Sequence, residues 1–200
     1  QSRVQEKQRI ARAAISELPV AGVLMVDAGT TPRLVCEALP RDRRFTVVTN
    51  AVPSAVVLAR NPNVHVLLVG GTMKGDTMAV VGVDAVAAIE ERVADLAILG
   101  TDGMTAEHGL TTHAQDEAFT KRAMIAASRR SIVVADHTKF GASQLAKFAA
   151  IKDVDTIVTD AGLTDEPSPE AEDLRRELVG SSAPAPEPGR GNDMADKNGK

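Results

Sequence analysis

The stretch VDAGTTPRLV, residues 26–35, marks the change from a strand to a helix. An apolar run ends at Asp27, and Ala-Gly then precedes Thr30, Thr31 and Pro32. Proline suits the first helical turn, and a threonine there can cap unpaired backbone N–H groups. The same N–H groups, together with the helix dipole, can instead bind an anion. The stretch therefore predicts a strand–helix junction that serves either as a plain helix cap or as a phosphate site.

Strands and helices alternate on both sides of this junction. The strands are continuously apolar, which is typical of strands covered on both faces. We therefore expect an α/β fold with a mainly parallel sheet of about six strands and helices on both faces. The predicted strands are 23–27, 45–50, 64–71, 96–103, 131–136 and 156–160, with a short extra strand at 78–84. The predicted helices between and after them are 32–39, 53–60, 84–92, 115–128 and 167–178.

The two ends of the chain differ from this alternating region. Residues 3–18 show apolar side chains at three- and four-residue steps, and Pro19 follows them, which predicts an amphipathic helix. The last residues are rich in Pro, Gly, Ser and charge, which is typical of a disordered tail. We expect a helix over 1–19, one domain over 20–179 and a tail over 180–200. The first residue is Gln, and we expect the chain to be a fragment.

Composition excludes several classes of protein. Hydrophobic residues make up 44% and aromatic residues 2%, so the core must consist of aliphatic side chains. The net charge of −4 argues against nucleic-acid binding by this chain alone. No apolar run approaches a membrane span of about 18 residues, and no signal peptide opens the chain, so we expect a cytoplasmic protein. The single Cys36 is expected to be a small buried apolar residue.

Small or polar residues follow nearly every predicted strand. Turns favour such residues, but ligands of open parallel sheets also bind beyond the carboxyl ends of the strands. The full set favours a ligand site at this edge. Its members are Asp27, Gly29, Thr30, Thr31, Thr49, Asn50, Gly70, Gly71, Gly100, Thr101, Asp102, Gly103, Asp136, Lys139, Thr159 and Asp160.

Three charged residues near this edge leave alternatives open. Asp27 would repel a phosphate, so it is better suited to accept hydrogen bonds from sugar hydroxyls or from loop amides. Lys139 either supplies positive charge for a phosphate or is an ordinary solvated lysine. Lys121 follows Glu117 by four residues, a spacing typical of a surface helix pair, but it could also place a cation at the edge of the site.

Motifs for other chemistries are missing. The phosphate-loop candidate matches neither GxxxxGK nor GxGxxG, and no GxSxG is present. His65 lies inside a predicted strand, while His108, His113 and His137 lie in loops at no spacing typical of a metal site. We therefore expect neither a metal nor a cofactor.

An ordered set of motifs resembles the C-terminal effector-sensing domain of DeoR-type bacterial transcriptional repressors. The set runs from about residue 6 to residue 162. It consists of EKQRIARAA, DAGTT, VVTN, VLLVGG, GVDAV, LGTDGM, HGLTT, DEAFTKRAMI, VADHTKFG and IVTD. The resemblance implies a domain similar to ribose-5-phosphate isomerase that binds phosphorylated sugars or related metabolites. It also implies a homo-oligomer and an N-terminal winged helix-turn-helix, absent here, that binds operator DNA. Residues 1–19 would be the helix that links the two parts.

The resemblance assigns site residues one by one. Gly29, Thr30 and Thr31 match a phosphate loop, and Asp27 matches its leading acid. The remaining matches are Thr49 and Asn50 in TN, Gly70 and Gly71 in the glycine pair, Asp102 and Gly103 in GxDG, Lys121 in EAxxKRxMI, and Asp136 and Lys139 in DxxKFG. His137 and Thr138 stand where small serines are common, and THAQDEA replaces a frequent Asn-bearing stretch. These departures concern the identity of the ligand more than the fold.

Two functions remain to be weighed. The first is a metabolite sensor without turnover, in which loops 72–80 and 104–116 close over the ligand and reorient helix 3–18. The second is an aldose–ketose isomerase, with Asp102 and Glu117 as candidate bases. The stretch TDGM carries one acid where the isomerases have an acid-rich turn, so we expect a sensor and not an enzyme.

Overall fold

The computed structural model describes residues 2–160. Its centre is a six-stranded sheet whose paired strands are all parallel, in the order β11-β9-β6-β1-β2-β3. The strands are β1 (Gly22–Val26), β2 (Phe45–Thr49), β3 (Val64–Leu68), β6 (Leu96–Leu99), β9 (Ser131–Val134) and β11 (Thr156–Val158). The expected α/β class and the expected number of strands are confirmed.

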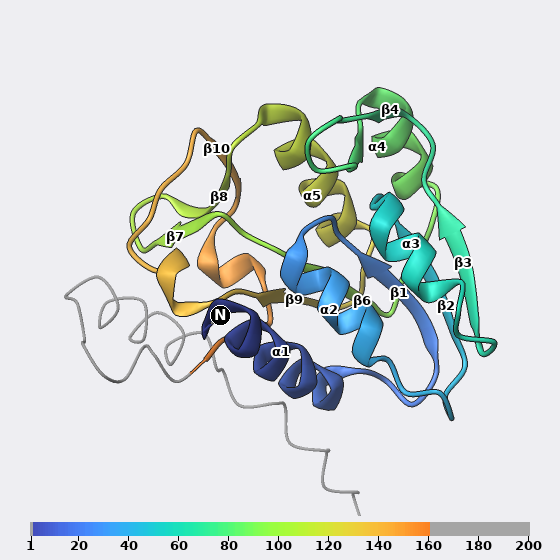
Figure 1. The fold of residues 1–200 in the computed structure, drawn as a ribbon. Coiled ribbons are helices and arrows are strands. Elements are labelled where there is room, and N and C mark those ends of the chain that lie inside the picture. Colours follow the sequence, from blue (N-terminus) through green and yellow to red (C-terminus); the bar gives the residue numbers. More distant parts are fainter. Residues whose placement is uncertain (1, 161–200) are drawn as a thin grey trace, which may run out of the picture.

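Helices cover both faces of this sheet (Figure 1). Successive side chains of a strand point to opposite faces, so Leu24 joins one half of the core and Met25 the other. Helices α1, α2 and α3 pack mainly on the Leu24 face, and α4 and α5 on the Met25 face. Their bounds are α1 (Ser2–Ala14), α2 (Thr30–Ala38), α3 (Val52–Leu58), α4 (Val83–Glu90) and α5 (Gln115–Ala126).

Helix α1 is an integral part of the domain. Its side chains Ile10, Ala11 and Ala14 are buried in the core half that also contains α2. The helix ends earlier than predicted, and the 3-10 turn η1 (Ile15–Glu17) continues it to the loop before β1. The amphipathic pattern therefore predicted the helix and most of its buried face, but Val4, which belongs to the same apolar pattern, is 58% exposed.

A second, antiparallel sheet was not predicted. Its order is β10-β8-β7, with β7 (Gly103–Thr105), β8 (Gly109–Thr112) and β10 (Ala146–Ala149). The predicted strand 96–103 was wrong in its second half, because β6 ends at Leu99 and Gly103 opens β7. The predicted strand 64–71 likewise ends at Leu68. Short segments rich in Gly and Thr carry too weak an apolar pattern to be identified as strands.

The remaining short elements lie in the connections between these strands and helices. A hairpin pairs β4 (Thr72–Met73) with β5 (Val80–Val81), which is shorter than the strand expected at 78–84. Two 3-10 turns, η2 (His137–Lys139) and η3 (Ile151–Asp153), follow β9 and β10.

Cys36 is a free, buried thiol, as expected. The expected helix 167–178 and tail 180–200 lie outside the described residues. Within the described range, no helix combines the length and apolarity that crossing a bilayer requires.

Candidate functional site

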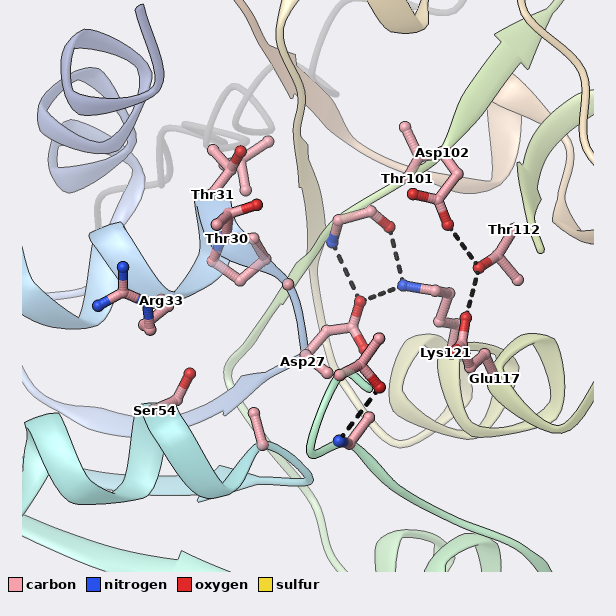
Figure 2. A pocket seen from close by; sticks show the side chains of 18 of the residues that line it. Asp27, Thr30, Thr31, Arg33, Ser54, Thr101, Asp102, Thr112, Glu117 and Lys121 are labelled. Atoms are coloured by element: carbon pink, nitrogen blue, oxygen red, sulfur yellow. Dashed lines mark hydrogen bonds and ion pairs between the residues drawn. The ribbon is translucent and has the colours of Figure 1, made fainter. Parts of the chain in front are cut away.

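A cavity of about 480 Å³ opens at the carboxyl ends of β1, β2, β6 and β9 (Figure 2). It brings together nine of the thirteen predicted site residues, which come from five separate parts of the chain. These nine are Asp27, Gly29, Thr30, Thr31, Asn50, Asp102, Lys121, Asp136 and Lys139. Their convergence agrees with the rule that parallel sheets bind ligands at this edge, while the role of each residue stays a prediction.

One side of the cavity is formed by the start of α2. Gly29 is the N-cap residue at φ 136°, a conformation that favours glycine, and no side chain caps the first turn. The simple cap predicted as one alternative is therefore wrong. The N–H groups of Thr30 and Thr31 have no acceptor within the helix and can bind an anion, whereas Pro32 has no N–H and the Arg33 N–H donates to the Gly29 carbonyl at 3.1 Å. Thr30 and Thr31 line the same wall. We call residues 29–31 the donor end.

Two lysines line the cavity beside or near the donor end. Lys7 of α1 places its Nζ 3.4 Å from Thr30 Oγ1 and 3.8 Å from Asp136 Oδ2. Lys139 follows Asp136 by three residues and is half-buried in the same lining. The sequence analysis missed Lys7, because a lysine on an amphipathic helix usually belongs to the solvated face. The available signal was the spacing: Lys7 precedes the buried Ile10 and Ala11 by three and four residues, which places it on their side of the helix.

The floor of the cavity is an ion pair between Asp27 and Lys121, both buried. Asp27 Oδ2 also accepts a hydrogen bond of 3.1 Å from the Gly100 amide, and Lys121 Nζ donates one of 3.0 Å to the Gly100 carbonyl. Burial raises the pKa of Asp27, and the Lys121 ammonium and the amide oppose that rise. Lys121 is only 5% exposed, so the alternative of a surface pair with Glu117 is wrong. Of the two roles weighed for Asp27, loop-amide binding is the one observed.

The opposite side of the cavity is acidic (Figure 2). Thr112 Oγ1 lies 2.9 Å from Asp102 Oδ2 and 2.9 Å from Glu117 Oε2. These three residues come from the loop after β6, from β8 and from α5, and all three line the cavity. We call Asp102, Thr112 and Glu117 the acidic end. Sequence analysis missed Thr112, because its strand was not predicted.

The β4–β5 hairpin closes part of the cavity. Residues 76–79 of its turn line the opening, and Met78 adopts a left-handed conformation with φ 53°. Lys74 in the hairpin lies 3.1 Å from Glu117 Oε1 and 3.6 Å from Asp116 Oδ1 on α5. Burial alone would lower the pKa of Lys74, but the bond to Glu117 and the nearby acids outweigh it and raise that pKa.

Four predicted site residues lie outside the cavity lining. Thr49 donates to the Val26 carbonyl at 2.7 Å and accepts from the Ala51 amide, so it joins β1 to β2. A Cβ at Gly71 would lie 2.8 Å from the Val81 carbonyl oxygen, and one at Gly103 would lie 2.4 Å from that of Ala142. These two glycines permit close backbone packing. Gly70 precedes Gly71 in the same turn, and a Cβ there would meet open space.

Three possible metal ligands lie outside the set of residues that line the cavity. Oxygen and nitrogen atoms of Glu6, His137 and Asp160 lie within 4.8 Å of one another. His137 Nδ1 is 2.8 Å from Asp160 Oδ2, and the His137 amide donates to the other oxygen at 2.8 Å. These hydrogen bonds account for the placement of His137 without an ion, and the expectation that the protein binds no metal stays a prediction.

Comparison with known sequences identifies a family. The family described as the DeoR C-terminal sensor domain matches residues 2–161. The HTH-type transcriptional regulator GlpR of Haloferax volcanii is 37% identical over 157 residues, covering 78% of this chain and 61% of that protein. The glycerol-3-phosphate regulon repressor of Escherichia coli K12 is 32% identical over 160 residues, covering 80% and 64%. The chain thus spans a little over three fifths of the length of these relatives.

Comparison with solved structures supports the fold. The full-length sorbitol operon regulator SorC from Klebsiella pneumoniae aligns with a TM-score of 0.54 at 11% identity, covering 88% of this chain and 72% of that chain. Ribose 5-phosphate isomerase A from Neisseria gonorrhoeae aligns with a TM-score of 0.47 at 18% identity, covering 70% and 53%. This second likeness is too low to bear on substrate or reaction.

Proposed function

The chain belongs to the DeoR C-terminal sensor domain family, and on that basis we propose that its cavity binds a phosphorylated sugar or a related metabolite. In the longer protein, occupancy of the cavity would change the affinity of an N-terminal helix-turn-helix for operator DNA. The names of the similar proteins, a glycerol-3-phosphate regulon repressor among them, support a regulator of carbohydrate metabolism.

The observation that carries this proposal is the uncapped start of α2 facing a lysine. The first-turn N–H groups, two threonine hydroxyls and the Lys7 ammonium all lie at one wall of the cavity. Backbone N–H groups at a helix start favour negative charge, and a phosphate can accept hydrogen bonds from all of these donors at once. Lys139 adds a second positive charge to the lining.

The isomerase alternative has less support. Its two candidate bases, Asp102 and Glu117, are both within hydrogen-bond distance of one hydroxyl, and Glu117 also pairs with Lys74. The similar proteins named above are transcriptional regulators. Equilibrium binding requires no turnover, so we propose that the domain is a sensor and not an enzyme.

The site of action and the assembly complete the proposal. DNA and phosphorylated metabolites meet in the bacterial cytoplasm, so we place the protein there. We also propose that it works as a homo-oligomer, with operator DNA bound only through the segment that precedes this chain in its relatives.

Thermal unfolding with a panel of sugar phosphates tests the phosphate site. A ligand present at ten times its Kd stabilises the fold by about 1.4 kcal/mol, or roughly 3–6 °C for a domain of this size. The variants Thr31→Val and Lys139→Met should lose most of that shift, because each removes one phosphate partner. Lys152→Met, on an exposed lysine in η3, is the matched control and should keep it. Equal stabilisation of all three variants would place the phosphate elsewhere.

A further inference from the structure

We propose that the acidic end binds hydroxyl groups of the ligand and rejects a second anionic group. The cavity would then select monophosphorylated polyols and sugars over bisphosphates and over phosphorylated carboxylic acids. This inference rests on the proposed function, because it assumes that a phosphate occupies the donor end.

The first argument is a count of protons at the acidic end. Thr112 Oγ1 lies 2.9 Å from a carboxylate oxygen of Asp102 and 2.9 Å from one of Glu117. A hydroxyl carries one proton, and an ionised carboxylate has none. Thr112 can therefore donate to only one of the two acids at a time. The other oxygen requires a donor from elsewhere, and the hydroxyl of a bound polyol is such a donor.

The second argument is an independent acceptor in the same cavity. Asn50 is 2% exposed, and its Nδ2 donates to the Val80 carbonyl at 3.2 Å, which fixes the orientation of the amide. Its Oδ1 is buried and accepts no hydrogen bond from any residue in the described part of the chain. A buried acceptor without a donor costs free energy. Asn50 and the acidic end are therefore both hydrogen-bond acceptors that a ligand with hydrogen-bond donors would satisfy.

The third argument is the distribution of charge. Among the described ion pairs, the ammonium at the acidic end is that of Lys74, which bonds Glu117 and Asp116, and the exposed imidazole of His113 lies 3.9 Å from Asp102. Three of the four cations in the cavity lining have partners, and the fourth, Lys139, forms no ion pair among the described residues and follows Asp136, whose carboxylate contacts Lys7 beside the donor end. Lys121 pairs with Asp27, Arg33 with Glu37 and Lys7 with Asp136. A second phosphate or a carboxylate beside Asp102 and Glu117 would thus meet two negative charges and little uncommitted positive charge.

Two matched ligand pairs test the selectivity. Glycerol 3-phosphate and 3-phosphoglycerate differ by a hydroxymethyl group against a carboxylate. Fructose 6-phosphate and fructose 1,6-bisphosphate differ by a hydroxyl against a phosphate. We expect calorimetry at fixed pH and ionic strength to show binding about tenfold or more weaker for the second member of any pair that binds.

Charge-neutral variants assign the selectivity to the acidic end. Asp102→Asn and Glu117→Gln should each reduce the ratio within a pair several-fold, because each removes a negative charge without changing the shape of the side chain. Asp116→Asn is the matched control. Asp116 also contacts Lys74 but does not line the cavity, so the ratio should stay close to that of the unmodified protein.

The outcomes distinguish this inference from the proposed function. Equal affinities within both pairs, together with measurable binding of inorganic phosphate, would overturn the acidic-end inference and leave the phosphate site intact. The inference would also be overturned if Asp116→Asn changed the ratio of affinities within a ligand pair as much as Glu117→Gln does. Failure of inorganic phosphate and of all four ligands to bind would overturn both proposals.

Discussion

The donor end and the acidic end of the cavity are built in different ways. The donor end uses three consecutive residues, 29–31, and its main groups belong to the backbone at the start of α2. The acidic end uses side chains from three separate elements, which the small antiparallel sheet and α5 hold together. A backbone site suits any phosphate, whereas a side-chain site can change with each substitution. We infer that the donor end selects phosphorylated compounds as a class and that the acidic end selects among them.

The largest effect is expected between the two ends, at the buried Asp27–Lys121 pair. Lys121→Met leaves the Asp27 carboxylate buried without a cation, which typically costs about 3–5 kcal/mol of unfolding free energy. Urea unfolding measures this loss. The double variant Asp27→Asn, Lys121→Met is the control, and it should recover much of the stability because it leaves no buried charge.

The same variant should alter the pH dependence of stability. Burial raises the pKa of Asp27 above its ordinary value of 3.8, and removal of the Lys121 ammonium raises it further. An acid whose pKa is higher in the folded state contributes less stability as pH rises from the ordinary pKa through the folded one. Lys121→Met should therefore lose more stability at pH 8 than at pH 5. An equal loss at both pH values would contradict this account of the pair.

A smaller effect is expected at Lys7, which lies beside the donor end. Lys7→Met removes an ammonium from the cavity wall and should weaken binding of glycerol 3-phosphate about tenfold. Lys7 also pairs with the buried Asp136, so the unfolding free energy should fall as well, by about 1 kcal/mol, which is less than at Lys121 because Thr138 still donates to Asp136. The loss should be alike for fructose 6-phosphate and fructose 1,6-bisphosphate. A change in their ratio would show that the two ends are not separate, and Lys152→Met again controls for the loss of a lysine.

The smallest effect is expected at the hairpin that covers the acidic end. Lys74→Met removes the bridges from the hairpin to Glu117 and Asp116 and should increase the dissociation rate about threefold. It also leaves Glu117 without its cation, so discrimination against a bisphosphate should increase. Stopped-flow displacement measures the rate. A slower dissociation would mean that the bridges hold the hairpin open and not closed.

Most of the parallel sheet was predictable because its strands are buried on both faces and so are continuously apolar. The antiparallel sheet was not predictable for two reasons. Its strands have only three or four residues, several of them Gly or Thr, and β10 pairs with β8 from more than thirty positions away. Apolar periodicity is a local signal, and it carries no information on a pairing of this kind.

The site residues also differ in whether the local sequence identifies them. Gly29, Thr30 and Thr31 could be identified because a strand end, a glycine and a helix start are adjacent in sequence. Lys7 and Thr112 could not, since each reaches the cavity only through packing of α1 or through the unpredicted strand β8. Gly71 and Gly103 lie outside the cavity lining, and their role in binding stays a prediction. Both follow or begin strands as a binding glycine would, but each is required where two backbones approach closely.

The contact between α1 and the cavity has an optical consequence. The chain contains no Trp and no Tyr, so a single introduced indole would be its only strong near-ultraviolet fluorophore. Val4 is 58% exposed and lies one helical turn before Lys7, on the same side of α1. A tryptophan at this position would stand beside the ammonium that touches Thr30. Its emission would then report whether the cavity is occupied. Helix α1, which would carry this reporter, is at the end of the chain where the relatives extend further.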